Sequence, residues 1–204
     1  MQLDTDLTGL FGITLAIVAL LVRLPRVKAL PLPRRAGLLA AAIVVVSIPL
    51  WGVSAAGFVR GMTGDLSIST LVLLALASAR SFSGKVMIGD QDRFAMLTTI
   101  LIAAVLFYPL ALGLGMFDPY RLGYGNLWFM AALLVIAVWS GLRYSMLLAL
   151  CIALAVAAWS AGWYESPNLW DYLLDPWLAV YALAVQLKKG LSRWRGNKHA
   201  RFEP

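Results

Sequence analysis

Two arginines, Arg60 and Arg121, are the residues of this sequence whose type and position best suit ligand chemistry. A guanidinium presents a planar fork of donors that binds a phosphate or carboxylate through two parallel hydrogen bonds. The turn Gly123-Tyr-Gly125 follows Arg121 and would let the backbone approach a headgroup. We therefore expect one pocket in which both arginines approach a shared anion, with the ligand-binding residues Arg60, Arg121, Tyr120, Tyr124 and Asp118.

Three carboxylates, Asp65, Glu165 and Asp171, are predicted to lie near these arginines as catalytic proton acceptors. The sole histidine, His199, sits in a basic tail, which argues against a haem held by paired histidines, a histidine-based zinc site and a Ser-His-Asp triad. We expect no resident metal and no cofactor.

A purely structural role explains part of this polar set. Helix N-termini have unpaired amides and a positive dipole end, so they favour capping carboxylates and amides. Arg60 could contact the carbonyls that end its helix, and Arg121 could pair with Asp118 one turn away. Residues predicted to cap helices are Asp6, Asp65, Asp92, Asp118, Asn126 and Asp175.

The elements that position these residues are apolar runs. Apolar residues make up 61% of the 204 positions, against about 45–50% in soluble chains. Each run approaches the roughly 20 residues that cross a bilayer. The sequence predicts an all-α, polytopic membrane bundle of about seven transmembrane helices, at residues 7–23, 36–58, 66–80, 94–117, 127–142, 144–163 and 176–193.

Basic residues predict the orientation of this bundle, because they resist translocation and so mark the cytoplasmic side. Of the 17 lysines and arginines, only Arg60 and Arg121 fall in gaps assigned to the outer side. The N-terminus is therefore expected outside and the C-terminus in the cytoplasm of a bacterial inner (plasma) membrane. The sequence predicts one transmembrane domain, 1–187, followed by a basic cytoplasmic tail, 188–204.

Two further segments have predicted roles. Ser166 and Pro167 favour the start of a short interfacial helix on the outer face, within an aromatic belt. The third run, 66–80, is short for a full crossing and is either extended by its neighbours or partly re-entrant. The lone cysteine, Cys151, is expected to be an apolar packing residue.

Three classes of function remain open on these patterns. The leading hypothesis is a cell-envelope protein that engages a lipid headgroup or lipid-linked phosphate at its outer face, as an enzyme or as the membrane subunit of one. The second is a non-catalytic scaffold for a membrane-protein partner or a homo-oligomer. The third is a transporter or flippase, disfavoured because no charged residue lies near the middle of a predicted span. Membrane lipids are the expected partners, and nucleic acid is not, because the net charge of +7 lies beside membrane ends.

Overall fold

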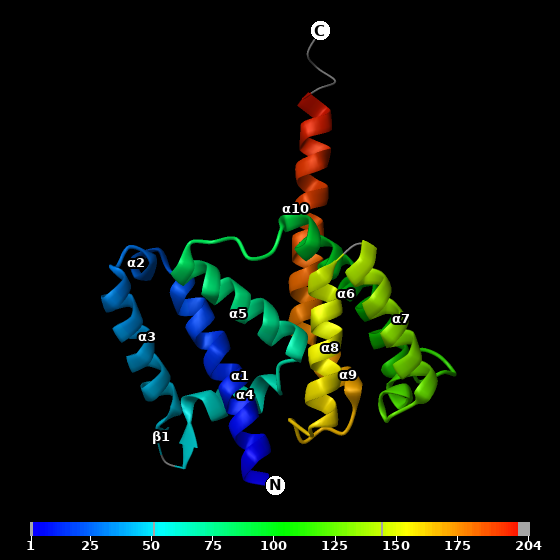
Figure 1. Cartoon of the computed structure of the whole chain (residues 1–204), viewed down its shortest axis with the longest axis horizontal. Coiled ribbons are helices and arrows are strands. Elements are labelled where there is room, and N and C mark those ends of the chain that lie inside the picture. The colour runs from blue at the N-terminus through cyan, green and yellow to red at the C-terminus, as the bar shows by residue number, and fades with distance from the viewer. Residues whose placement is uncertain (1, 51, 144, 200–204) are drawn as a thin grey trace.

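The chain folds into a bundle of helices (Figure 1). The computed structural model describes residues 2–50, 52–143 and 145–199, and the side chains of 6–49, 52–143 and 145–194. Within these ranges the all-α prediction is confirmed, apart from one short hairpin. The elements are α1 (Gln2–Arg23), α2 (Pro25–Lys28), α3 (Leu32–Ser47), β1 (Pro49–Leu50), β2 (Val53–Ser54), α4 (Ala55–Thr63), α5 (Ile68–Ser83), α6 (Asp90–Ala111), the 3-10 helix η1 (Pro119–Gly123), α7 (Leu127–Arg143), α8 (Met146–Ser160), α9 (Leu169–Leu173) and α10 (Pro176–His199).

The length of each helix determines whether it could cross a membrane. Two helices of the described chain are long and apolar enough to cross a bilayer, namely Asp6–Arg23 within α1 and the whole of α6. The helices α5, α7 and α8 are apolar but shorter. By length and composition alone, two crossings are therefore weakly indicated.

The predicted second span, 36–58, is wrong as a single helix. The chain leaves α3 at Ile48, pairs Pro49 with Ser54 in an antiparallel hairpin, and starts α4 directly afterwards. Proline lacks an amide hydrogen and disfavours helical backbone in the preceding residue, so Pro49 ends the helix. Ser54 then caps α4 by accepting a hydrogen bond from the Gly57 amide at 3.0 Å. The result places Arg60 on a separate short helix.

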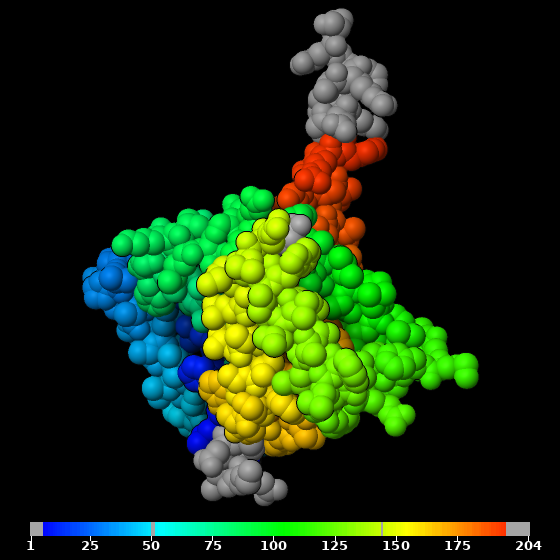
Figure 2. Space-filling view, turned by 45° about the vertical axis from the view of Figure 1, so that its right-hand side comes forward, coloured from blue at the N-terminus to red at the C-terminus, as the bar shows by residue number. Residues whose placement is uncertain are grey.

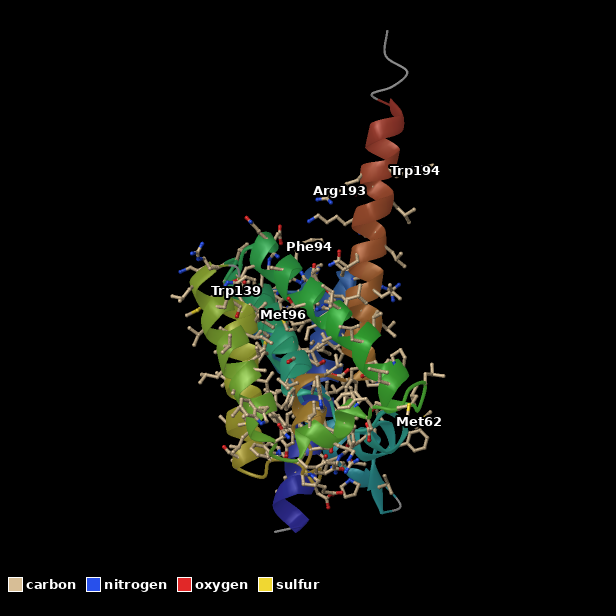
Figure 3. All side chains as sticks on the ribbon, turned by 90° about the vertical axis from the view of Figure 1, so that its right-hand side faces the viewer. Met62, Phe94, Met96, Trp139, Arg193 and Trp194 are labelled. Carbon is tan, nitrogen blue, oxygen red and sulfur yellow. The ribbon has the colours of Figure 1, made fainter. Side chains whose placement is uncertain are left out.

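The last helix, α10, continues well past the predicted domain boundary at residue 188. It runs unbroken from Pro176 to His199, and its C-terminal part stands clear of the bundle (Figure 2). Arg193 and Trp194 lie on this projecting part, at the opposite end of the molecule from Met62 (Figure 3). The first part of the predicted tail is thus helical, and residues 200–204 lie outside the described ranges.

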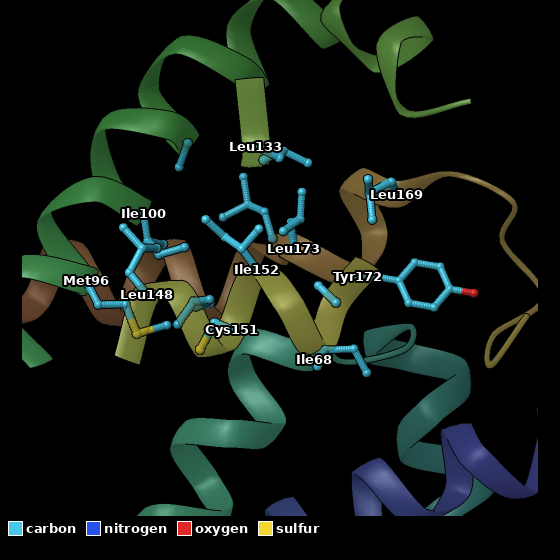
Figure 4. Close-up of a cluster of buried hydrophobic side chains, with 14 of the residues drawn as sticks. Ile68, Met96, Ile100, Leu133, Leu148, Cys151, Ile152, Leu169, Tyr172 and Leu173 are labelled. Carbon is cyan, nitrogen blue, oxygen red and sulfur yellow. The ribbon is translucent and has the colours of Figure 1, made fainter. Parts of the chain in front are cut away.

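The main hydrophobic core lies among α5, α6, α7, α8, α9 and α10 (Figure 4). Cys151 of α8 is buried there as a free thiol, so its predicted packing role is confirmed. Two smaller clusters attach the other half of the molecule, joining α1 to α4 around Ile13 and α1 to α3 around Val22. Since α5 contacts both α1 and α8, it connects the two halves.

Three of the predicted caps are confirmed. Asp175 caps α10 through the Leu178 amide at 2.8 Å. Asn126 accepts from the amides of the first turn of α7, and Asp118 accepts from the Tyr120 amide at the start of η1.

The other three predicted caps are wrong. Within the described chain, Asp6 and Asp65 bond to Arg60 and not to the first-turn amides of a helix, and α6 begins at Asp90, before Asp92. Asp6 lies inside α1, Ser67 caps α5 in place of Asp65, and Asp92 lies inside the first turn of α6. The helix predicted to start at Ser166 and Pro167 begins later, since α9 starts at Leu169 with Asn168 as its N-cap.

Candidate functional site

Arg60, in the last turn of α4, is held by carboxylates from three parts of the chain. Its Nε and Nη2 donate to the two oxygens of Asp65 at 2.6 and 3.1 Å, and its Nη1 donates to Asp6 of α1 at 2.8 Å. Glu165, in the loop after α8, lies 3.7 Å from Nη2. The structure therefore brings together Arg60 and two of the three predicted catalytic carboxylates, Asp65 and Glu165. We call Arg60, Asp6, Asp65 and Glu165 the Arg60 cluster.

The cluster lies directly against the backbone of α1. A methyl group added at Gly9 would overlap the Arg60 guanidinium and a carboxylate oxygen of Asp65. Only glycine leaves this space at the helix surface, so α1 and α4 approach each other closely here. The Thr8 hydroxyl, one residue earlier, donates to the carbonyl of Trp163, which fixes α1 against the loop that carries Glu165.

This arrangement leaves Arg60 little capacity for a ligand. The side chain is 17% exposed, and the hydrogen bond to Asp65 raises the pKa of its guanidinium above the ordinary value, more than burial lowers it. Three carboxylates surround one cation, so the cluster is net acidic. A further anion would have to displace a carboxylate that is already bonded through the bidentate geometry.

The third predicted catalytic carboxylate, Asp171 of α9, belongs to a different group of contacts. It accepts hydrogen bonds from the Tyr120 hydroxyl at 2.9 Å and from the Ser166 hydroxyl. The Asn168 side-chain amide donates to the Tyr120 carbonyl at 2.9 Å, and a methyl group at Gly123 would overlap Asn168. These contacts join η1 to α9 and use the polar groups in packing.

Aromatic rings complete this join between η1 and α9. The Trp170 ring packs between those of Phe107 and Phe129, with centroid distances of 4.4 and 4.7 Å, and its Nε1 donates to the Pro119 carbonyl. Tyr120 contacts the Tyr124 ring edge-on at 5.7 Å. Tyr120 and Tyr124 therefore lie together as predicted, while only Tyr124 is largely exposed.

Arg121 is exposed and, within the described chain, forms no hydrogen bond or ion pair with Asp118, with the Arg60 cluster or with any other side chain. The contacts of the described residues thus do not assemble the predicted pocket between Arg60 and Arg121. The alternative pairings proposed from sequence are also absent among them, because Arg60 uses carboxylates in place of helix carbonyls and Asp118 uses its oxygen as a cap.

Sequence reasoning missed a buried polar latch between the N-termini of α5 and α10. One oxygen of Asp175 accepts from the Ser67 amide at 2.9 Å, the Ser67 hydroxyl at 2.7 Å and the Thr70 hydroxyl, while the other caps α10. Ser67 and Asp175 are 0% and 4% exposed. Ser67 and Thr70 have the spacing of a helix start, which was the available signal, but nothing local to them indicates a partner 108 residues away.

Sequence reasoning also missed a cavity of about 470 Å³ between the two halves of the molecule. Apolar side chains of α1, α5 and α10 form most of its wall, among them Ile13, Leu74 and Leu178. Figure 1 shows why the space exists, since α5 and α10 lie close together where they begin and diverge toward the end of α5. Of the residues that line it, Arg23 and Arg80 lie at the ends of α1 and α5 and Arg93 at the start of α6, whereas Thr63, Thr70 and Trp177 lie at the end of α4 and the starts of α5 and α10. We call this space the groove.

Among the described side chains, no group of three or more histidine, cysteine, aspartate or glutamate residues is placed to hold a metal ion. Comparison with protein-family models, with curated proteins and with solved structures finds no match.

Two buried tyrosines beside the Arg60 cluster give a pH-dependent prediction. The Tyr164 hydroxyl donates to the Leu66 carbonyl at 2.7 Å, and the Tyr172 hydroxyl accepts from the Tyr164 amide at 2.9 Å. Burial raises the pKa of both phenols above the ordinary 10.0. The unfolded chain therefore loses these protons first, so their contribution to stability is complete below pH 10 and declines as the pH rises further.

We expect the free energy of unfolding to fall above pH 10 by up to about 1.4 kcal/mol per pH unit for each of these tyrosines. Thermal unfolding in detergent at stepped pH measures this slope. Tyr164→Phe should make the decline shallower, whereas Tyr124→Phe, at an exposed position, should not. Equal slopes in both variants and in the parent protein would contradict the assignment.

Proposed function

We propose that this protein is a seven-span protein of the bacterial inner membrane, with its N-terminus outside, and that it binds a membrane lipid inside its bundle. The proposal keeps the lipid-engaging class indicated by the sequence and moves the binding site from the outer face to the groove. The observation that carries it is the groove itself, whose volume of about 470 Å³ lies within the roughly 300–1,000 Å³ typical of ligand sites.

The distribution of charge supports a bilayer environment. Arg23 ends α1, Arg80 lies in the last turn of α5, Arg143 ends α7, and Arg93 lies in the first turn of α6. Three of these arginines lie in the last turns of α1, α5 and α7, and Arg93 lies in the first turn of α6, which runs in the opposite direction, so all four lie on the same side of the bundle (Figure 1). The Arg60 cluster lies at the opposite ends of α1 and α5. This separation fits the preference of basic residues for the cytoplasmic side.

The surface between these two ends is suited to hydrocarbon. On α7 alone, four large apolar side chains are each more than half exposed, namely Leu134, Val135, Val138 and Trp139. A contiguous apolar face of this kind is unfavourable in water. The helices α5, α7 and α8 have 16, 17 and 15 residues, short of the roughly 20 that span a bilayer of average thickness. Local thinning of the bilayer accommodates short helices at modest cost.

A lipid chain is the occupant that suits the groove in this setting. Its wall is predominantly apolar along α1 and α5, and polar groups appear only near its two ends. An apolar cavity next to a bilayer is filled most readily by the apolar chains that surround it. No reaction is part of this proposal, because Asp65, Glu165 and Asp171 are already bonded to Arg60, Tyr120 or Ser166 and none of them lines the groove.

A non-catalytic scaffold is the second candidate. It is favoured by the outer polar groups, which bond to one another and connect α1, α4, η1 and α9. In this function the protein would present its exposed apolar helices to a membrane-protein partner or to a second copy, and the groove would hold only incidental lipid.

Filling the groove tests the leading proposal. Ala77 of α5 lines the groove, so Ala77→Phe should lower the amount of co-purified lipid and weaken binding of a phospholipid with a fluorescent chain by roughly tenfold, equivalent to about 1.4 kcal/mol. Ala132→Phe makes the same change on the exposed face of α7 and should leave binding unchanged. Equal lipid binding by the two variants, measured by native mass spectrometry and by fluorescence, would favour the scaffold.

A further inference from the structure

We infer that the groove takes an anionic phospholipid of the cytoplasmic leaflet, with one acyl chain along α1 and α5 and the headgroup phosphate at Arg23, Arg80 and Arg93. This inference rests on the proposed function and deepens it, because it names the class of lipid and the leaflet from which it enters.

The two ends of the groove differ in chemistry. Arg23, Arg80 and Arg93, from three different helices, line one end, whereas Thr63 and Thr70 line the other. The segment that contains Val86 and Met87 also lines the groove and passes beside the arginine end between α5 and α6 (Figure 1). A molecule that fills this space with complementary groups has an apolar body and one anionic end.

The cations at this end are available to a ligand, in contrast to Arg60. Among the described side chains, no carboxylate forms an ion pair with Arg23, Arg80 or Arg93. Asp92, close to Arg93 in sequence, accepts from the Leu147 amide at 3.4 Å. Guanidiniums bind phosphate oxygens through parallel hydrogen bonds, and several together favour phosphate over an uncharged headgroup.

Arg93 is oriented by a neighbour that does not neutralise it. One of its terminal nitrogens donates to the Tyr181 hydroxyl, and its guanidinium carbon lies 5.7 Å from the centre of the Tyr181 ring. Tyr181 also lines the groove. A guanidinium has five N–H donors, so this contact positions the group and leaves donors for a phosphate.

The length of the groove suits one leaflet. From Ile13 to Arg23 on α1, and from Thr70 to Arg80 on α5, the wall extends about 15 Å at 1.5 Å per residue. The hydrocarbon core of a bilayer is about 30 Å thick, so one acyl chain reaches about half of it. With the arginine end on the cytoplasmic side, the chain and the headgroup both match the inner leaflet, where anionic lipids give a negative surface potential.

The test compares headgroups at a constant acyl chain. The full-length protein is reconstituted in nanodiscs with equal amounts of phosphatidylglycerol and phosphatidylcholine, released, and analysed by native mass spectrometry for the lipid that stays bound. We expect phosphatidylglycerol to be retained over phosphatidylcholine by roughly tenfold or more. In the double variant Arg23→Gln/Arg80→Gln this preference should fall toward equality while one lipid remains bound.

Arg143→Gln is the matched control, because Arg143 is an exposed basic residue at the end of α7 that does not line the groove. It should keep the preference. The single variants Arg23→Gln and Arg80→Gln carry the same change in net charge as Arg143→Gln. If all three single variants lose the preference for phosphatidylglycerol to the same extent, net charge alone accounts for it and the inference is overturned. Competition by glycerol phosphate, which lacks a chain, would also overturn it, because it would indicate a site for the free anion.

The inference and the proposed function fail in different ways. If Ala77→Phe removes the bound lipid but the parent protein retains both lipids equally, the groove binds lipid and the headgroup assignment is wrong. If Ala77→Phe has no effect on any retained lipid, the groove is not the site and both proposals are wrong. Arg93 is left unchanged in these experiments because its contact with Tyr181 connects α6 to α10.

Discussion

Replacing Asp175 by alanine should lower the free energy of unfolding by about 3 kcal/mol, the largest effect we expect from a single polar side chain. Two losses of stability add: α10 loses its N-cap, worth about 1 kcal/mol, and the buried Ser67 amide and hydroxyl lose their acceptor, worth about 1–3 kcal/mol. Both consequences follow from the two oxygens of Asp175, which bond to different helices.

Asp175→Asn should also destabilise the protein, by about 1–2 kcal/mol. Asparagine caps a helix well, so from sequence alone it is expected to be equivalent. In the structure its amide nitrogen, a donor, would have to face either the Ser67 amide or the Leu178 amide, which are donors too. Thermal unfolding in detergent gives the comparison, with Asp118→Ala as the control because Asp118 is an exposed cap. Similar losses for Asp118→Ala and Asp175→Ala would show that the latch to α5 adds nothing.

Replacing Arg60 by alanine should cost about 2–3 kcal/mol, because it leaves three carboxylates without their cation and removes charged hydrogen bonds to Asp65 and Asp6. Arg60→Lys keeps the charge but loses the planar fork that bonds both oxygens of Asp65, so it should cost roughly half as much.

Arg121→Ala provides the matched control for Arg60, since both arginines lie on the predicted outer side and Arg121 is exposed. Its effect on thermal unfolding should stay within about 0.5 kcal/mol. In the double variant Arg60→Ala/Asp65→Ala part of the loss should be recovered, because one uncompensated carboxylate is removed with the cation. Equal destabilisation by Arg60→Ala and Arg121→Ala would mean that the Arg60 cluster contributes no stability.

Local patterns predicted the helices and three of their caps. Asp175, Asn126 and Asp118 each bond to an amide two or three residues later, and such contacts depend only on neighbouring residues. The break between α3 and α4 also had a local signal in Pro49 and Gly52, which the continuous hydropathy of the run 36–58 outweighed in the prediction.

What the sequence did not predict depends on contacts between distant residues. Asp65 and Ser67 are two residues apart and both suit a helix start, and the choice between them was made by Arg60 and Asp175. The groove could not be predicted for a similar reason, because side chains such as Leu74 that line it are of the same types as those that fill the core. Only the angle between α5 and α10 determines whether such residues meet each other or leave a space.

The Arg60 cluster also joins parts of the chain that a ribosome produces at different times. Asp6, Arg60 and Asp65 are all present once α4 and the start of α5 have been made, whereas Glu165 and the Trp163 carbonyl that accepts from Thr8 come about a hundred residues later. Because proteins are synthesised from the N-terminus and early segments fold first, α1 and α4 can associate through Asp6 and Arg60 before α8 exists. The loop after α8 then docks on a surface already in place. The Arg60 cluster is therefore completed in two stages during synthesis, first by Asp6 and Asp65 and later by Glu165.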